Sequence, residues 1–233
     1  MFVVKSVKRS AQAQELRRDA IVDHALDLAD REGLDAVAIR RIAADFSVTP
    51  MALYWHVKNK DELLDAMGDR IFESLGPSDA SAPWLDQVRE AVSALVTALR
   101  VHPASVELAY RRILSSPHGR ALSEQVLKAL RDAGFSVRQA ADLARLALQT
   151  AVSLVSGMPG AELDVPEPER EAMTAGKKAA LEQLPTGAFP NLIECAVALT
   201  TCDDQELYYG GGIDLYIAGV AGLATRLPSA VPA

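Results

Sequence analysis

Two helix starts lie close together in one stretch of the chain: Thr49-Pro50-Met51-Ala52-Leu53-Tyr54-Trp55-His56-Val57-Lys58-Asn59-Lys60-Asp61-Glu62-Leu63-Leu64. Thr49 is a favoured N-cap, and Pro50 suits the first helical position, where its missing N–H costs nothing. Asn59 with Glu62 three residues later resembles a capping box. The stretch therefore predicts a very short helix over about 50–57, followed at once by another helix that extends to about residue 75.

The residues before this stretch predict a support for the short helix. An apolar stripe at helical spacing indicates a helix over 17–32, and Gly33 ends it as a glycine just past the last turn commonly does. A second short helix over about 39–46 would turn Ile42, Ala43 and Phe46 inward. Two short helices joined by a tight turn and packed on a supporting helix are typical of a helix-turn-helix unit, here over 15–75.

The rest of the chain predicts a larger helical body. The segment 76–83 is rich in small residues and proline and would be the joint between two domains. Beyond it, helical patterns cover about 84–101, 104–115, 119–133, 136–156, 168–183, 190–201 and 204–226. We therefore expect an all-α protein with a basic arm over 1–14, a DNA-binding domain over 15–75, and a ligand-binding and dimerisation domain over 84–226.

Positive charge gathers near the N-terminus although the whole chain has a net charge of −7. Residues 1–18 hold five basic side chains against one acidic, a net of +4, and residues 36–60 hold four against one, a net of +3. Residues 76–233 carry a net of −5 and would be repelled by DNA. One end of the molecule is therefore suited to phosphate. The arm is either a solvated tail or a segment that follows the DNA backbone or minor groove.

Other classes of protein find little support. The chain contains no GxSxG, GxxxxGK or HExxH motif, so an enzyme is not expected. Its four histidines and two cysteines lack metal-site spacing, which predicts no metal and no cofactor. The apolar runs are too short for a membrane span or a signal peptide, so we expect a cytoplasmic protein. The alternative left open is a helical small-molecule-binding or interaction module without DNA activity.

Three segments of the chain resemble the TetR family of transcriptional repressors, most of all its tetracycline-repressor branch. They are Glu32-Gly33-Leu34, Arg40-Arg41-Ile42-Ala43 and the stretch from Leu53 to Leu64. The resemblance implies a homodimer that binds a pseudo-palindromic operator in double-stranded DNA and is released by a small molecule. An activator reads DNA in the same way, so that possibility stays open. Leu53 and Trp55 are expected in the core. The residues expected at DNA are Arg40, Thr49, Pro50, Met51, Ala52, Tyr54, His56, Lys58 and Lys60.

Two positions depart from the family pattern. The family usually has threonine near Ala38, and the lost helix cap should cost about 1 kcal/mol. It usually has glycine at Ser47, where a serine must bear any positive φ at a cost on the order of 1 kcal/mol. Neither change is expected to abolish the motif.

Two helices predict the dimer interface. The segments 136–156 and 204–226 are apolar nearly all round, and such helices must be covered on every side. Three consecutive glycines at 210–212 would allow close approach to a partner helix. Pairing across a two-fold axis would give a four-helix interface, whereas the alternative is that both helices are ordinary core of a monomer. The predicted interface residues are Leu143, Ala147, Ala151, Val155, Gly211, Ile213, Ile217 and Val220.

A ligand site is expected among the helices from 84 to 156. The tetracycline repressor holds its magnesium-bound drug partly through two histidines, and this chain has Gly76 and Arg112 at those positions. The resemblance therefore implies a different, mainly apolar inducer. The candidate lining residues are Trp84, Leu95, His102, Tyr110, Arg112, Val126 and Met158.

Overall fold

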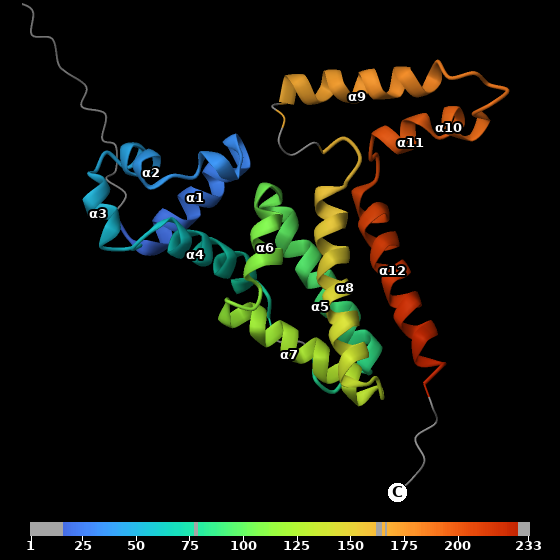
Figure 1. The fold of residues 1–233 in the computed structure, drawn as a ribbon, viewed down its shortest axis with the longest axis horizontal. Helices are drawn as coiled ribbons and strands as arrows, with labels where there is room; N and C mark the ends of the chain where they lie inside the picture. The colour runs from blue at the N-terminus through green and yellow to red at the C-terminus, as the bar shows by residue number, and fades with distance from the viewer. Residues whose placement is uncertain (1–15, 77–78, 162–164, 166, 228–233) are drawn as a thin grey trace, which may run out of the picture.

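The computed structural model describes residues 16–76, 79–161, 165 and 167–227. The predicted basic arm over 1–14 lies outside the described residues. Within them every regular element is a helix, so the expected all-α class is confirmed (Figure 1). None of the helices described is long and apolar enough to cross a membrane.

The N-terminal unit has four α-helices, α1 (Arg18–Glu32), α2 (Ile39–Asp45), α3 (Pro50–Tyr54) and α4 (Lys60–Glu73), with a 3-10 turn, η1 (Leu34–Ala36), after α1. Local chemistry sets their ends. The Thr49 side chain accepts a hydrogen bond from the backbone N–H of Ala52, and Asn59 accepts one from Glu62. Helix α3 ends at Tyr54, three residues earlier than the sequence pattern predicted.

Both family departures have the predicted local consequences. Ala38 stands at the N-cap of α2 without a side-chain cap, and Ser47 adopts a φ of 56° in the turn between α2 and α3. Ser47 is the one non-glycine residue with positive φ among those described. Serine here takes the positive φ that glycine adopts freely, at the expense of local strain.

The body is built from α5 (Trp84–Val101), η2 (Pro103–Ser105), α6 (Val106–Arg112), α7 (Pro117–Asp132), α8 (Val137–Ser156) and α12 (Gln205–Ala224). Helix α5 packs against α7, α8 and α12, and α8 also packs against α12. Ser136 and Gln139 form a capping box at the start of α8. The core is continuous from the N-terminal unit into this body, because buried residues of α1 and α4 belong to the same cluster as those of α5 and α8.

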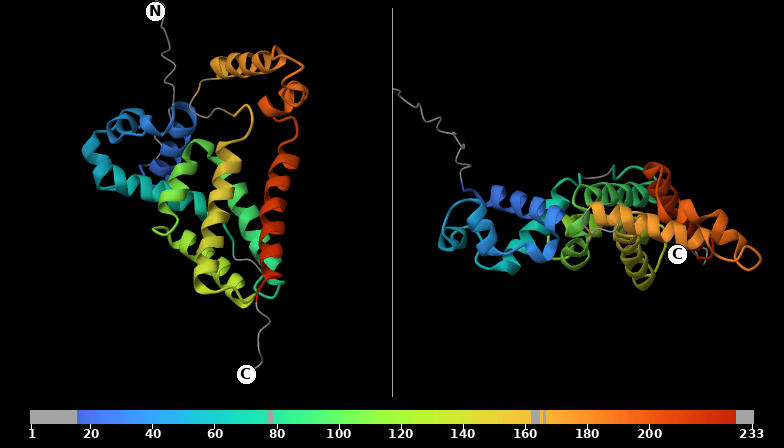
Figure 2. Two further views of the ribbon diagram at one scale, coloured as in Figure 1. Left: turned by 45° about the vertical axis from the view of Figure 1, so that its right-hand side comes forward. Right: turned by 90° about the horizontal axis from the view of Figure 1, so that it is seen from above.

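Helices α9 (Glu167–Glu182), α10 (Pro190–Glu194) and α11 (Ala196–Thr200) form a small layer that projects from the body. Figure 2 shows this layer at the end of the molecule away from α2 and α3. Helix α9 packs against α10 and α11. The single helix predicted over 190–201 is instead divided at Cys195, whose φ and ψ of −88° and 2° interrupt it.

The three consecutive glycines at 210–212 of α12 differ in their surroundings. A Cβ on Gly212 would lie 2.2 Å from the side chain of Leu154 on α8, whereas nothing lies within 4 Å of a Cβ on Gly210 or Gly211. Close approach therefore occurs at Gly212, within one chain. It explains one of the three glycines, and Gly210 and Gly211 have no such explanation inside the chain.

Gly119 permits the closest backbone contact in the body. A Cβ there would lie 2.2 Å from the carbonyl oxygen of Ile113, which is rigid backbone. We expect Gly119→Ala to lower the free energy of unfolding by about 1–3 kcal/mol, the usual cost of overpacking. The matched control is Gly176→Ala on α9, where the space is open. Denaturant unfolding followed by circular dichroism measures both, and equal stabilities would contradict the packing described.

Candidate DNA-binding surface and ligand cavity

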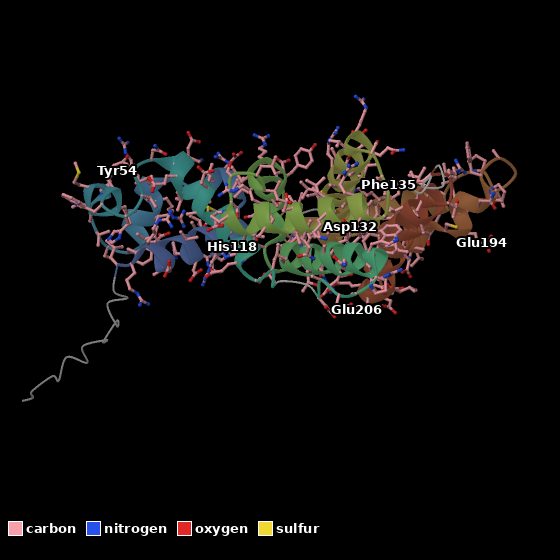
Figure 3. The ribbon with its side chains drawn as sticks, turned by 90° about the horizontal axis from the view of Figure 1, so that it is seen from below. Tyr54, His118, Asp132, Phe135, Glu194 and Glu206 are labelled. Carbon is pink, nitrogen blue, oxygen red and sulfur yellow. The ribbon has the colours of Figure 1, made fainter. Side chains whose placement is uncertain are left out.

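The outer surface of the N-terminal unit carries the residues predicted to meet DNA. Figure 3 places Tyr54 at one end of the molecule and Glu194 near the other. Met51 is 68% exposed and Tyr54 45% exposed, and Ala52 and His56 are partly exposed. The other five predicted residues are exposed: Arg40, Thr49, Pro50, Lys58 and Lys60. All nine predicted residues are therefore accessible from solvent.

Trp55 was predicted in the core, and this prediction is wrong: its side chain is 86% exposed. Leu53 and Val57, four residues apart, are fully buried and face the core. A residue two positions after Leu53 lies about 200° around a helix of 3.6 residues per turn, on the opposite side. Met51 and Trp55 are thus neighbours on the outer face, and Trp55 belongs with the candidate DNA-contacting residues.

The two adjacent arginines of α2 have different roles. Arg41 donates hydrogen bonds to Glu32 of α1 at 2.8 Å and to Asp45 at 3.2 Å. These hydrogen bonds, first that to Glu32, raise the pKa of Arg41. His24 of α1 also donates to Asp45, at 2.9 Å, and this contact contributes most to the lowered pKa of that carboxyl. Arg41 therefore joins α1 to α2.

Arg40, unlike Arg41, is available for contact with another molecule. It is exposed, and no side-chain hydrogen bond or ion pair engages it among the described residues. Lys58 in the turn after α3 and Lys60 at the start of α4 bring two further positive charges to this surface. An anionic backbone such as that of DNA would be attracted to this surface.

Helix α4 is attached to the body through a row of carboxylates. Asp61, Asp65 and Asp69 recur every four residues and so lie along one face of the helix. Arg112 of α6 donates to Asp65 at 2.5 Å and lies 3.6 Å from Asp61. Ser116 donates to Asp69 at 2.5 Å.

Two histidines also connect the N-terminal unit to the body. His118, at the start of α7, contacts Asp69 at 3.1 Å. His102, just before η2, contacts Asp30 near the end of α1 at 2.7 Å. Arg112 and His102 were predicted to line a ligand site. Their side chains instead hold the N-terminal unit against the body, because carboxylates of α1 and α4 lie within reach.

A cavity of about 40 Å³ lies between α5, α7 and α8. Leu95 and Val126 are the two predicted ligand residues found in its wall. The other lining residues are Ala91, Val92, Ile113, Leu122, Ser123, Ala144, Ala147 and Leu148. Pockets that bury small molecules usually measure about 300–1,000 Å³, so this cavity must enlarge to hold one.

The remaining predicted ligand residues lie elsewhere. Trp84 packs edge-on against Phe135, with ring centroids 6.0 Å apart. Tyr110 is 47% exposed on α6, and Met158 lies 3.3 Å from the hydroxyl of Tyr209 on α12. Among the residues described, no group of three histidine, cysteine, aspartate or glutamate side chains could hold a metal ion.

The residues predicted at a dimer interface lie mostly inside one chain. Only Gly211 is exposed. The periodicity could not show which face turns inward when a helix is apolar nearly all round. The packing of α8 on α12 and α5 buries the face that was predicted to form the dimer interface. The seven buried residues are Leu143, Ala147, Ala151, Val155, Ile213, Ile217 and Val220.

The outward face of α12 was not predicted. Leu207, Leu215 and Leu223 are 74%, 77% and 45% exposed, and recur every eight residues. Gly211 and Gly219 lie between them in sequence and are also exposed. Each step of eight residues turns about 80° around a helix of 3.6 residues per turn, so these residues form a stripe that winds around α12. A stripe of leucine and glycine in this arrangement is an apolar surface without a cover inside the chain.

Sequence profiles of known families match both parts of the chain. Residues 21–67 match the profile described as bacterial regulatory proteins, tetR family, and residues 76–223 match the one described as tetracyclin repressor-like, C-terminal domain. The protein belongs to the TetR family. The family is one of transcriptional regulators, and the TetR-family helix-turn-helix is the unit built from α1 to α4.

Relatives of known name agree with this membership. An HTH-type transcriptional regulator of Saccharopolyspora erythraea is 35% identical over 129 residues, which is 55% of this chain, and the chain spans about half, 55%, of that relative's length. The class D tetracycline repressor of Escherichia coli is 29% identical over 91% of this TetR-family chain and 92% of its own. The crystal structure of apo ActR from Streptomyces coelicolor has a TM-score of 0.68 at 28% identity, covering 90% and 98% of the two chains.

The attachment of α4 should depend on pH through Asp69. Burial acts to raise the pKa of this carboxyl, but hydrogen bonds from Ser116 and His118 outweigh it and lower the pKa. A carboxyl whose pKa is lowered in the folded state contributes stability above its ordinary pKa, and this contribution is lost as the pH falls through the lowered value. We therefore expect the free energy of unfolding to fall less steeply below about pH 4 in Asp69→Asn than in the wild type. Urea unfolding as a function of pH measures this, with the exposed Asp35→Asn as control, and identical slopes would contradict it.

Proposed function

We propose that this protein is a DNA-binding transcriptional regulator that represses by binding a pseudo-palindromic operator as a homodimer and is released by a small molecule. The observation that carries the proposal is the exposed surface of α2 and α3, with Arg40, Lys58 and Lys60 around the outward residues of α3. In this proposal residues 15–75 read DNA, and residues 84–226 sense the ligand and dimerise. No enzymatic activity is part of it.

The exposed surface suits a division of tasks between phosphate and base contacts. Tyr54, His56 and Lys60 would hold the DNA backbone and fix the register of α3. Arg40 would reach the DNA from the start of α2. The outer face of α3 is largely apolar at Met51 and Trp55, so van der Waals contact with thymine methyl groups would contribute more to sequence preference than bidentate hydrogen bonds.

A homodimer would present two such units to successive major grooves. The exposed leucine and glycine stripe of α12 provides a surface for a second copy, because its apolar side chains are left uncovered within the chain. Half-sites read by a dimer lie about 34–36 Å apart, one turn of DNA. The distance between the two DNA-binding units therefore decides whether both can bind.

Ligand release would work through α4. ActR has been crystallised with actinorhodin, which supports a small-molecule partner for a protein of this fold. Ile113 and Leu122 line the cavity, and the segment between them carries Ser116 and His118, which hold Asp69 of α4. A ligand that enlarged the cavity would shift this segment and favour a state with a different spacing of the DNA-binding units.

The DNA-binding proposal is tested with Arg40→Ala. Labelled DNA from the region upstream of the protein's own gene is titrated with protein over a series of salt concentrations, and binding is followed by fluorescence anisotropy. Loss of one phosphate-contacting charge should weaken binding at least about tenfold and reduce the salt slope by about 1. Arg111→Ala, an exposed arginine of the body paired with Glu107, is the control and should bind as the wild type does. Wild-type binding equal for random DNA would reject the regulator and favour the module without DNA activity.

The dimer proposal is tested with Leu215→Lys. Because residues at the centre of an interface often contribute about 2 kcal/mol or more, the dimer dissociation constant should rise at least about thirtyfold. Leu114→Lys, in the exposed turn after α6, is the control with the same change of side chain. Sedimentation velocity measures the association state, and a monomeric wild type, or a variant that dimerises normally, would contradict the assignment of this face.

A further inference from the structure

The cavity between α5, α7 and α8 has no charged side chain in its wall, and this limits what can occupy it. We propose that the cavity is the sensing site for neutral apolar molecules and excludes molecules that carry an ionised group. The inference rests on the proposed ligand-responsive function and adds the chemical class of the ligand.

The wall is almost entirely hydrocarbon. Nine of its ten residues are alanine, valine, leucine or isoleucine, and Ser123 is the one polar side chain. The Ser123 hydroxyl already donates a hydrogen bond to the carbonyl oxygen of Gly119 at 2.8 Å. Its oxygen can still accept hydrogen bonds, so among the side chains of the wall a ligand meets a single polar atom, which acts as an acceptor.

Two basic residues adjoin the wall in the chain and are committed to other partners, while the acidic neighbours Glu90 and Glu124 are exposed to solvent. Arg112 precedes Ile113 in the chain, but its guanidinium is paired with Asp65 and Asp61 of α4. Arg145 follows Ala144, but it donates to Asp142 at 2.7 Å on the surface of α8. An ionised ligand would therefore lose its hydration in the cavity without gaining a counter-charge, which is strongly unfavourable.

The wall also has places where it can enlarge. Ala91, Ala144 and Ala147 contribute only methyl groups from α5 and α8, so a ligand would pack directly on the surfaces of these two helices. Ile113, Ser123 and Ala144 are only partly buried, whereas Leu95 is 3% exposed. Outward movement of the wall is therefore less costly at these three partly buried residues than at Leu95 on α5.

Two fluorescent probes with the same ring skeleton test the charge limit. N-phenyl-1-naphthylamine is neutral, and 1-anilinonaphthalene-8-sulfonate carries one sulfonate. Both become brighter in apolar surroundings, so each can be titrated directly with the full-length protein. We expect the neutral probe to bind at least about tenfold more tightly than the anion.

Two substitutions assign the binding to this cavity. Ala144→Leu fills the space and should weaken the neutral probe at least about tenfold. Ser123→Lys brings an ammonium group to the partly exposed edge and should strengthen the anionic probe about tenfold. Ala121→Lys adds the same charge on the exposed side of α7 and should change neither probe. Helicity measured by circular dichroism shows which variants are folded.

The outcomes separate the ligand class from the regulator itself. Two results together support the proposal. The wild type prefers the neutral probe and loses this preference in Ala144→Leu, and tight binding of the anionic probe appears only in Ser123→Lys. Any of three results would overturn it. The anionic probe binds as tightly as the neutral probe, Ala144→Leu leaves binding of the neutral probe unchanged, or the neutral probe does not bind at all. Operator binding is measured on the same preparations by anisotropy. If the protein binds its operator but the probe titrations give an overturning result, only the ligand class is rejected. If the protein does not bind its operator, the proposed function is rejected.

Discussion

Helix α4 carries two stripes of opposite character, and the relation between the DNA-binding unit and the body depends on both. Leu63, Met67 and Ile71 are buried in the common core, while Asp61, Asp65 and Asp69 form a row on the other side. The two stripes are offset by two residues, which places them about 200° apart on the helix. The apolar stripe fixes α4 in the fold, and the acidic row attaches it to α6 and α7 through Arg112, Ser116 and His118.

The strengths of these two attachments differ. Full burial of one leucine or isoleucine side chain contributes about 1.5–3 kcal/mol, and the stripe of α4 includes several such residues. The carboxylates of the acidic row are 39–83% exposed, and exposed ion pairs usually contribute about 0–1 kcal/mol each. The coupling free energies of allosteric proteins are about 1–3 kcal/mol. In the proposed mechanism, a ligand would change the contacts of the acidic row while the apolar stripe keeps the two parts of the chain together.

Much of the DNA-binding surface could be predicted because its signals are local. Thr49 and Asn59 cap their helices through hydrogen bonds to residues three positions later, and Ser47 has positive φ in the predicted turn. Trp55 could not be placed in this way. A large aromatic side chain is commonly buried, and only the position of Leu53 and Val57 in the core shows that Trp55 points outward.

The sequence by itself determined the all-α class, most helix ends, the helix-turn-helix and the position of its positive charges, since these follow from periodicity, capping and composition within short segments. Only the tertiary structure decided which side of α8 and α12 is buried, because both helices are apolar nearly all round. It also decided that Arg112 and His102 bind carboxylates at the joint and do not line the cavity. The partner of a charged side chain depends on what lies beside it in space. Arg112 and Asp65 are 47 positions apart in the chain, and His102 and Asp30 are 72 positions apart.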